Sequence, residues 1–467
     1  MHQHHSSARL SRRNSVTADA FGWSLRAKAA ALDPPPNAAN LRSSKAPPMS
    51  AHDELHLAPA DDEKHAPPEP EPAQPQRDRR DSDAWADLKA AQIRSACRDA
   101  DVDTLTRLAT SKGGLLSDRL RRDAWPLLLG SLPDTHSDTD WSDLQPHHDE
   151  DQVKLDVNRS FVYYPKDQSE QQIEERKEEL FDVIAQILRR HPRLCYFQGY
   201  HDIVQVFLLV LGSDLAVPAV TRLSLLRIRD FMLPSLDAAI AHLKLLPSIL
   251  YTADPALYAH LRPAEPFFAL AATITMFAHD IQEYGDIARL FDFLLAREAA
   301  FSVYLFASII LTRKDELLEI SPDDTDVLHV TLQNLPKPLD LEGLISSTVE
   351  LFTKTPPESL PYGAWRAISP YSVLRTTREP RALTTQTLEQ GEELFAKHEE
   401  QIRRANIYKA RVTAIKRGLW RYRRPAGGFA MAIAVGVLAW WLGRSDHGAT
   451  YLSTIRQTLY IFFGQYR

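Results

Sequence analysis

The stretch that decides the fold is residues 169–190, which reads SEQQIEERKEELFDVIAQILRR. Ser169 precedes Gln172 at the spacing of a capping box, in which each side chain bonds the backbone N–H of the other residue. Apolar residues then recur at helical spacing, at positions 173, 180, 183, 184, 187 and 188. Pro192 ends the pattern, because the residue before a proline is driven out of helical geometry. The stretch therefore predicts an amphipathic helix.

Helical patterning continues on both sides of this stretch. Residues 203–211 are apolar on every side, as expected of a helix buried inside a larger bundle. Strict apolar and polar alternation with Asn-Gly or Asp-Gly turns, the signal of β-hairpins, is missing. With 467 residues, 44% of them apolar, the chain can bury a sizeable core. We therefore predict one large all-α domain over residues 85–355.

Charge and cysteine content exclude several classes of protein. Lysine and arginine number 55 against 61 aspartates and glutamates, a formal net charge of −6. Bulk nucleic-acid binding is excluded as the main function, because neutralising phosphates requires a basic surface. Cys97 and Cys195 cannot form a secreted disulfide scaffold or a four-cysteine zinc site. We expect the body of the protein to lie in a reducing compartment.

Residues 1–84 have the composition of a disordered, proline-rich tail. Eleven of the 31 prolines lie there and large apolar residues are rare, so the segment buries too little surface to offset its ordering entropy. Arg26 and Lys28 interrupt the early apolar stretch, which argues against a signal peptide. Residues 1–32 faintly resemble a mitochondrial presequence, but we favour a solvated tail.

The C-terminal part of the chain predicts attachment to a membrane. Residues 356–387 are interpreted as a polar loop and residues 388–424 as a juxtamembrane helix, of which the part from 403 to 424 holds nine basic residues and no acidic one. Residues 425–443 predict a transmembrane helix. The 18 residues from Ala426 to Gly443 carry no charge, and at about 1.5 Å per residue they span roughly 27 Å.

A buried core helix is the alternative interpretation of residues 425–443. Trp440 and Trp441 at one end and the basic cluster at the other favour a membrane, since these features mark bilayer interfaces and the cytoplasmic side. The tail 444–467 has Arg456 within an apolar stretch, and a charge at mid-membrane is costly, so we favour an interfacial helix over a second span. We expect a tail-anchored protein with a single span and a cytosolic N-terminal domain.

Two kinds of site are not expected. Residues 147–150 read His-His-Asp-Glu, which are metal-binding residue types. They lie in an acidic segment without distant partners, so we interpret them as a solvated loop and predict no metal site. The sequence has no Gly-x-x-x-x-Gly-Lys loop to hold phosphates, so we expect no nucleotide site of its own.

Three short motifs remain, and each has a structural explanation when taken alone. They are RRDAWPLLLG at 121–130, VKLDVNRS at 153–160 and YFQGYHD at 196–202. Trp125 in the first is expected in a core. Asp156 and Arg159 in the second are spaced as a local helix pair, worth a few tenths of a kcal/mol. Gln198 in the third could cap a turn.

Together and in this order, the motifs resemble the TBC domain family, the all-helical activators of Rab GTPases. The first stretch is similar to the family's Arg-x-x-x-Trp motif, and the second to Ile-x-x-Asp-x-x-Arg with Val153 in place of isoleucine. The third is similar to Tyr-x-Gln-Gly. Residues 289–296, RLFDFLLA, resemble the Arg-Leu-x-Asp helix found later in such domains. The resemblance covers residues 85–355.

The resemblance implies roles for eight residues. Arg159 would be an arginine finger and Gln198 a second finger that orients the attacking water, with the GTP-bound Rab as partner. Asp156 would hold Arg159, and Tyr196 would frame Gln198. The other implied supporting residues are Arg121, Trp125, Gly199 and Asp202. GTP and magnesium would be held by the Rab, so the chain would need no cofactor of its own.

Residues 196–203 and 229–232, together with the predicted anchor, look like an ER-anchored branch of this family. That likeness implies the endoplasmic reticulum membrane, with the Golgi membrane as the alternative, and a Rab of the ER-to-Golgi step. A non-catalytic Rab-binding adaptor or tether is the alternative function. Its support is the proline-rich tail, which could dock partner domains, but the retention of both fingers counts against it.

Overall fold

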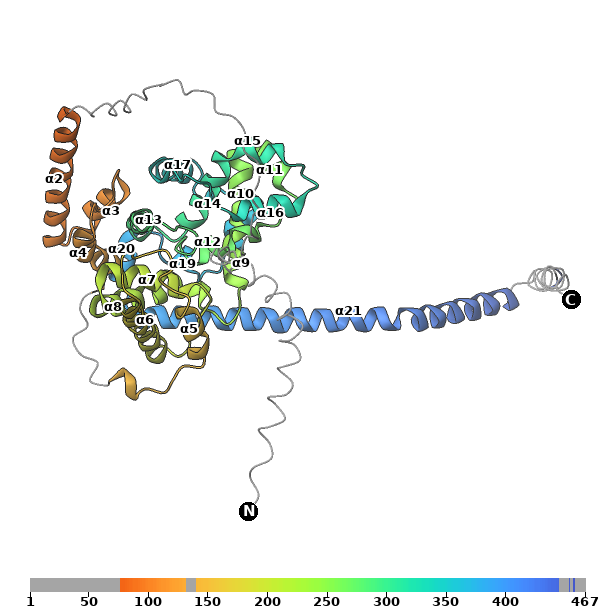
Figure 1. Cartoon of the computed structure of the whole chain (residues 1–467). Helices are drawn as coiled ribbons and strands as arrows, with labels where there is room; N and C mark the ends of the chain where they lie inside the picture. Colours follow the sequence, from red (N-terminus) through yellow and green to blue (C-terminus); the bar gives the residue numbers. More distant parts are fainter. Residues whose placement is uncertain (1–75, 132–139, 445–452, 454–456, 458–467) are drawn as a thin grey trace, which may run out of the picture.

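The computed structural model describes residues 76–131 and 140–444, with the single residues 453 and 457. Every regular element in these ranges is helical, which confirms the all-α prediction (Figure 1). The first part of the body contains α2 (Gln76–Arg98), α3 (Val102–Thr110), α4 (Asp118–Leu129), η3 (Trp141–Asp143), α5 (Glu150–Val157), α6 (Glu170–Arg190), α7 (Tyr200–Leu211), α8 (Ser213–Leu226), η4 (Arg229–Phe231), α9 (Asp237–Leu243) and α10 (Leu245–Ala253).

The second part begins with α11 (Pro255–Leu261), η5 (Pro266–Ala269), α12 (Leu270–Ile274), α13 (Tyr284–Ala296), α14 (Phe301–Thr312), α15 (Lys314–Glu319), α16 (Thr325–Gln333) and α17 (Leu341–Lys354). It continues with η6 (Pro357–Ser359), η7 (Pro361–Gly363), α18 (Ala364–Ala367), α19 (Val373–Thr376), α20 (Pro380–Thr385) and the long α21 (Leu388–Arg444). The helices gather into one body from which α21 extends (Figure 1).

Helix α6 forms where the sequence predicts it. Ser169 is its N-cap, and both bonds of the capping box with Gln172 are present. His191 is the C-cap, directly before Pro192. The apolar positions from Leu180 onward are buried, whereas Ile173 is half-buried against the core. The predicted apolar helix is α7, which is buried along almost its whole length.

Three aromatic side chains join α4, α7 and α13 at the centre of the body. The Trp125 ring centroid lies 5.3 Å from that of Phe207 and 6.0 Å from that of Phe291. Phe207 and Phe291 are themselves 5.8 Å apart. Tilted aromatic contacts of this kind contribute about 0.5–1.5 kcal/mol beyond the burial of their area. The cluster therefore fixes α7, whose first turn holds the last residues of the third sequence motif, Tyr200–Asp202.

The helical body extends beyond the predicted domain at both ends. α2 begins at Gln76, so a helix replaces the last part of the predicted disordered tail. The prediction of a polar loop over residues 356–387 is wrong, because this segment contains short helices and contributes to the core. Leu360, Val373 and Leu374 are only 6%, 0% and 1% exposed. One-turn helices are too short to produce a recognisable periodicity, which is why the pattern appears to be a loop.

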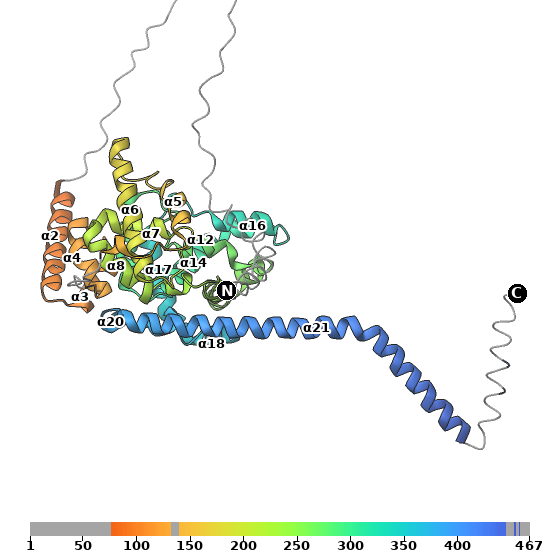
Figure 2. The same cartoon turned by 90° about the horizontal axis from the view of Figure 1, so that it is seen from below.

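α21 joins into one helix the two segments predicted separately at 388–424 and 425–443. Its first turns pack on the body. A Cβ atom added to Gly391 would lie only 2.9 Å from Leu226 Cδ2, and Phe395 is 1% exposed. The helix then runs out past the body (Figure 2).

Within the described part of the chain, no helix has both the length and the apolar character needed to cross a membrane. The transmembrane helix at 425–443 therefore stays a prediction. The predicted tail over residues 1–75 lies outside the described residues, as does the predicted interfacial helix in 444–467 apart from single positions.

Candidate functional site

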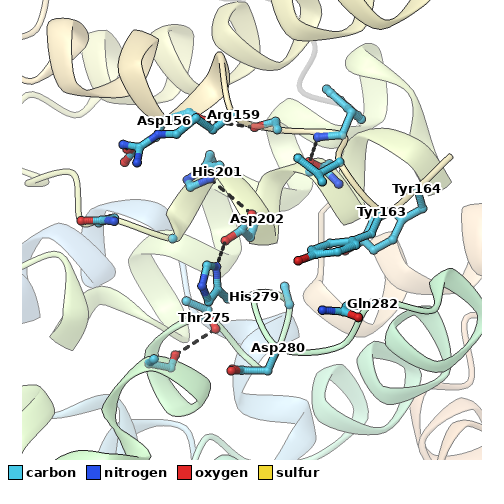
Figure 3. Close-up of a pocket in the computed structure, with 18 of the residues that line it drawn as sticks. Asp156, Arg159, Tyr163, Tyr164, His201, Asp202, Thr275, His279, Asp280 and Gln282 are labelled. Carbon is cyan, nitrogen blue, oxygen red and sulfur yellow. Dashed lines mark hydrogen bonds and ion pairs between the residues drawn. The ribbon is translucent and has the colours of Figure 1, made fainter. Parts of the chain in front are cut away.

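A cavity of about 530 Å³ opens where the second and third motifs meet. Its walls come from the end of α5 and the chain after it, the first turn of α7, the segment after α12, and the end of α16 (Figure 3). Five of the predicted site residues line it: Asp156, Arg159, Gln198, Gly199 and Asp202. The two implied fingers, which are far apart in sequence, therefore share one cavity.

Arg159 follows the last turn of α5 and is held by that helix. Its Nη2 donates to Asp156 Oδ1 at 2.9 Å. The Asp156 side chain is 1% exposed, whereas that of Arg159 is 53% exposed. Gln152 Nε2 donates to the same oxygen at 3.1 Å. A buried carboxylate thus orients a guanidinium that reaches solvent. The pair therefore differs from the solvent-exposed helix pair that the spacing of Asp156 and Arg159 alone would suggest.

Tyr196 connects the loop that carries Gln198 to the segment that carries Arg159. Its hydroxyl donates to Asp156 Oδ2 at 2.9 Å, and its backbone N–H donates to Asp149 Oδ2 at 2.9 Å. Burial, reinforced by the negative charge of Asp156, raises the pKa of Tyr196 well above its ordinary value. The phenol therefore stays protonated and remains a hydrogen-bond donor.

Gly199 occupies a position that no other residue fits. Its φ is +97°, in the left-handed region that favours glycine, and it is the N-cap of α7. A Cβ atom there would lie 2.5 Å from Thr275 Cγ2. The glycine lets the loop after Gln198 turn tightly against the segment from α12, which holds Gln198 at the cavity wall.

Arg121 and Trp125 lie behind the site and meet at one buried carboxylate. Asp292 accepts from Arg121 Nε at 3.0 Å and Nη2 at 3.0 Å, from Trp125 Nε1 at 2.9 Å, and from the Leu115 backbone N–H at 2.9 Å. The Asp292 side chain has no exposed surface. These contacts place the first motif in the framework that supports α7. In the sequence, Asp292 stands out only as the last residue of the Arg-Leu-x-Asp run.

The interpretation of residues 147–150 as a solvated loop is wrong. His147 and Glu150 are 6% and 8% exposed. Glu150 binds the Arg189 guanidinium through both oxygens, at 2.6 and 2.8 Å, and accepts the His147 backbone N–H. His147, His148 and Asp149 have ligand atoms close enough to surround a metal ion. However, Asp149 accepts from Tyr196 and its N–H donates to His147 Nδ1, so these atoms already brace the loop.

The wall opposite Arg159 holds Asp202 together with two titratable residues, His279 and Asp280, that the sequence does not single out. Asp202 accepts from His279 Nδ1 at 3.0 Å, and Asp280 follows His279 in the sequence (Figure 3). Burial would raise the pKa of Asp202, but His201 and His279 outweigh burial and lower it. Burial raises the pKa of Asp280 to about 6. Among the described residues, none donates a hydrogen bond to the buried Oδ2 of Asp280.

Replacing Asp280 with asparagine should stabilise the body. The Asp280 pKa of about 6 exceeds the ordinary value of about 3.9. Its contribution to stability is therefore fully present below about pH 3.9 and is lost as the pH rises through about 6. We expect Asp280→Asn to raise the free energy of unfolding by about 1–3 kcal/mol at about pH 7.5, and by less toward about pH 4.5. Urea unfolding at both pH values measures this; equal stabilities at the higher pH would contradict it.

The loop before Tyr196 is also bound by the first turns of α21. His191 Nδ1 lies 2.7 Å from Glu392 Oε1, and Arg193 Nη2 lies 2.5 Å from Glu399 Oε2. The Arg193 guanidinium also lies over the Phe395 ring, 5.9 Å from its centroid. The beginning of α21 therefore belongs to the structure that positions the site, and a fragment that ends before residue 388 would lack these contacts.

Similarity to known proteins identifies the family of the chain. The chain matches the Rab-GTPase-TBC domain over residues 118–318. It is 40% identical to "TBC1 domain family member 20" of Homo sapiens over 285 residues, which cover 60% of this chain and 70% of that protein. It is 34% identical to "GTPase-activating protein gyp10" of Schizosaccharomyces pombe over 301 residues, 62% of this chain and 78% of that protein.

Among solved structures, the Ypt/Rab-GAP domain of Gyp1p is similar with a TM-score of 0.45 and 18% identity, covering 54% of this chain and 93% of that chain. The family match over residues 118–318 includes all three motifs. This match and the curated relatives confirm the resemblance drawn from the motifs. The chain belongs to the TBC domain family of Rab GTPase activators.

Proposed function

We propose that this chain accelerates GTP hydrolysis by a Rab GTPase by inserting Arg159 and Gln198 beside the nucleotide of its partner. The main support for this proposal is that both side chains line one cavity of about 530 Å³. Arg159 is held there by a buried carboxylate yet remains half-exposed, so its guanidinium can reach a partner.

The chemistry of GTP hydrolysis explains why these residue types suit the task. Charge spreads over the oxygens of the transferring phosphoryl group in a loose transition state. A guanidinium is permanently charged and offers a planar fork of donors that matches phosphate oxygens. An amide such as that of Gln198 can both donate and accept, which suits it to orient the attacking water. An arginine supplied in trans typically contributes about 10³–10⁵ in rate.

The nucleotide and its magnesium ion would be held by the GTPase. The chain has no phosphate-binding Gly-x-x-x-x-Gly-Lys loop, and its contribution is limited to side chains that complete a neighbour's site. Asp156, Tyr196, Gly199 and Asp202 then position the fingers. Arg121 and Trp125 support the site indirectly. Both bind Asp292, and Trp125 also belongs to the aromatic cluster that fixes α7.

The partner and the location are proposed from the resemblance of the sequence to the ER-anchored branch. We assign a Rab of the ER-to-Golgi step and the endoplasmic reticulum membrane, with the Golgi membrane as the alternative. The support is the likeness of residues 196–203 and 229–232 to the ER-anchored branch and the identity of 40% to "TBC1 domain family member 20". Fluorescence microscopy of the tagged full chain against ER and Golgi markers tests the location.

The C-terminal part of α21 is the proposed membrane attachment. Large apolar side chains are exposed there, including Phe429, Ile433 and Trp440 at 73%, 66% and 63%. An exposed apolar surface of this extent marks an interaction with a membrane or a protein. The nine basic residues within 403–424, directly before it, favour binding to an anionic membrane surface. Each lysine or arginine near such a surface contributes about 1 kcal/mol of electrostatic attraction.

A flotation assay tests the attachment. The full chain should float with vesicles that contain anionic lipid, and a chain truncated after residue 405 should not, because it lacks the exposed apolar and basic part of α21. The truncated chain keeps Glu392, Phe395 and Glu399 and so serves as a folded control. Recovery of the full chain in the dense, lipid-free fraction would contradict membrane attachment.

The proposed activity is tested with a panel of purified Rab proteins. Each is loaded with GTP, and the release of phosphate is measured with and without the full chain in detergent micelles. The proposal expects strong acceleration for one class of Rab. GTP-dependent binding with no acceleration for any Rab would instead support the non-catalytic adaptor or tether.

A further inference from the structure

One polar side chain lies within the buried apolar run of α7. Residues 203–211 read IVQVFLLVL, in which Gln205 is the one polar residue. Gln205 is only 5% exposed. Burying a polar side chain costs free energy unless its groups are hydrogen-bonded. The hydrogen-bond partner of Gln205 therefore indicates why a polar residue stands at this position.

The partner of Gln205 is the backbone of Phe161, two residues after Arg159. The Phe161 N–H donates to Gln205 Oε1 at 3.0 Å, and both residues line the cavity. Because a backbone N–H can only donate, the oxygen of the side-chain amide must face it. A contact between residues 44 positions apart thus joins α7 to the segment that carries Arg159.

This contact lies where the chain stops following α5. The Arg159 N–H still donates to the Asp156 carbonyl at 3.0 Å, and the Ser160 N–H donates to the Val157 carbonyl at 2.9 Å. The N–H of Phe161 turns to α7 instead. Gln205 therefore holds the first residue that leaves the local hydrogen-bond pattern of the helix end.

The backbone of Phe161 has a conformation that its surroundings must impose. Its φ is +61°, in the left-handed region that a bulky side chain rarely adopts. Such conformations persist only where other contacts determine them, and they gather at functional sites. The Phe161 ring is 6% exposed and packs in the core, while its N–H is bound by Gln205. These two contacts hold the turn from both sides.

We propose that Gln205 is a positioning residue: by binding the Phe161 N–H, it fixes the turn after Arg159 and sets the backbone from which the finger projects. This inference rests on the proposed function. Asp156 orients the guanidinium at the far end of the side chain. Gln205 fixes the near end, which matters because the side chain between them is 53% exposed.

The same contact also sets the two fingers relative to each other. Gln198 directly precedes Gly199, the N-cap of α7. Gln205 lies on that helix and binds the turn that follows Arg159. Both fingers must meet one transition state, and a misplacement of about 1 Å can cost about a hundredfold in rate. A direct bond between the two supporting elements limits such misplacement.

The test is single-turnover GTP hydrolysis by the Rab that responds best, with the full chain in micelles. Gln205→Met keeps the length of the side chain but removes its strong acceptor. We expect the maximal rate to fall about ten- to hundredfold, because the guanidinium is no longer held in its productive place. The chain concentration at half-maximal rate should change little, because Gln205 is buried and the docking surface is untouched.

Two further variants separate positioning from a merely structural role. Gln205→Glu keeps an acceptor oxygen in either protonation state and should retain most of the rate. Ser224→Ala is the matched control, because Ser224 Oγ lies 2.7 Å from the Tyr200 hydroxyl in a buried contact between α8 and α7. It removes one buried hydrogen bond of α7 without touching residues 159–161. It should lower the melting temperature as Gln205→Met does, but keep the rate of the parent.

Hydrogen–deuterium exchange of the Phe161 amide tests the contact without any Rab. The amide should exchange slowly in the parent, in Gln205→Glu and in Ser224→Ala, and faster in Gln205→Met. The measurement on the parent decides even if Gln205→Met does not fold. A Phe161 amide that exchanges in the parent as freely as a solvent-exposed amide would overturn the inference.

Failure of the inference and failure of the proposed function can be told apart. If the parent accelerates hydrolysis and Gln205→Met does so equally well, Gln205 has no positioning role but the proposed function stands. If Gln205→Met lowers the rate of Arg159→Ala by the same factor as that of the parent, Gln205 does not act through Arg159, and the inference is again overturned. If the folded parent accelerates no Rab, the proposed function fails, and this inference with it.

Discussion

Arg159→Ala should lower the stimulated rate of GTP hydrolysis at least about a hundredfold, and up to about 10⁵-fold. The guanidinium supplies positive charge where the transition state spreads negative charge, and neither Asp156 nor Gln198 can replace it. The loss corresponds to roughly 3–7 kcal/mol of barrier. Single-turnover phosphate release from a GTP-loaded Rab, at saturating concentrations of the chain, measures it.

The fold should survive this substitution. The Arg159 side chain is 53% exposed, and Asp156 keeps Gln152 and Tyr196 as donors. The melting temperature of the variant should therefore stay close to that of the parent. Arg159→Lys is the matched control, because it keeps the charge but loses the planar fork, and it should recover only a small part of the rate. A fully active Arg159→Ala would show that the finger assignment is wrong.

Asp292→Ala should have the largest effect on stability. The carboxylate accepts from Arg121, Trp125 and the Leu115 backbone in a site without solvent. Removing it leaves the Arg121 guanidinium buried with its main partner gone. Breaking a buried pair in this way costs about 3–5 kcal/mol. Urea unfolding followed by circular dichroism measures the free energy of unfolding.

The same helix provides the control for that prediction. Asp286 lies in the first turn of α13 and is half-buried. Burial raises its pKa, so its ionised form gains little from the fold. Asp286→Ala should therefore change the free energy of unfolding by less than about 0.5 kcal/mol. Equal losses in the two variants would contradict the central role of Asp292.

Features encoded by neighbouring residues could be predicted from the sequence. The capping box of α6, its apolar face and its end before Pro192 depend only on local spacing. The apolar run of α7 predicted burial correctly for the same reason. The second and third motifs could be recognised because each is a short run, at the end of α5 and at the start of α7. The packing of α5 beside α7 then brings Arg159 and Gln198 to one cavity.

Features that depend on pairing between distant residues could not be predicted. The contact of Arg121 with Asp292 spans 171 positions and that of Asp202 with His279 spans 77. Nothing in one sequence says which carboxylate meets which cation. The same limit misled the interpretation of residues 147–150, because Glu150 finds its partner Arg189 on α6 and Asp149 finds Tyr196. It also hid the contacts of α21 with His191 and Arg193.

The most direct test of the central claim is a comparison of the parent with both finger variants on one Rab. Single-turnover GTP hydrolysis is measured with the full chain, Arg159→Ala and Gln198→Ala, after each variant is shown to be folded. We predict strong acceleration by the parent and loss of most of it in each variant, because the two side chains act on the same transition state from one cavity. Acceleration that persists in both variants, or that is missing for every Rab with the folded parent, would contradict the account.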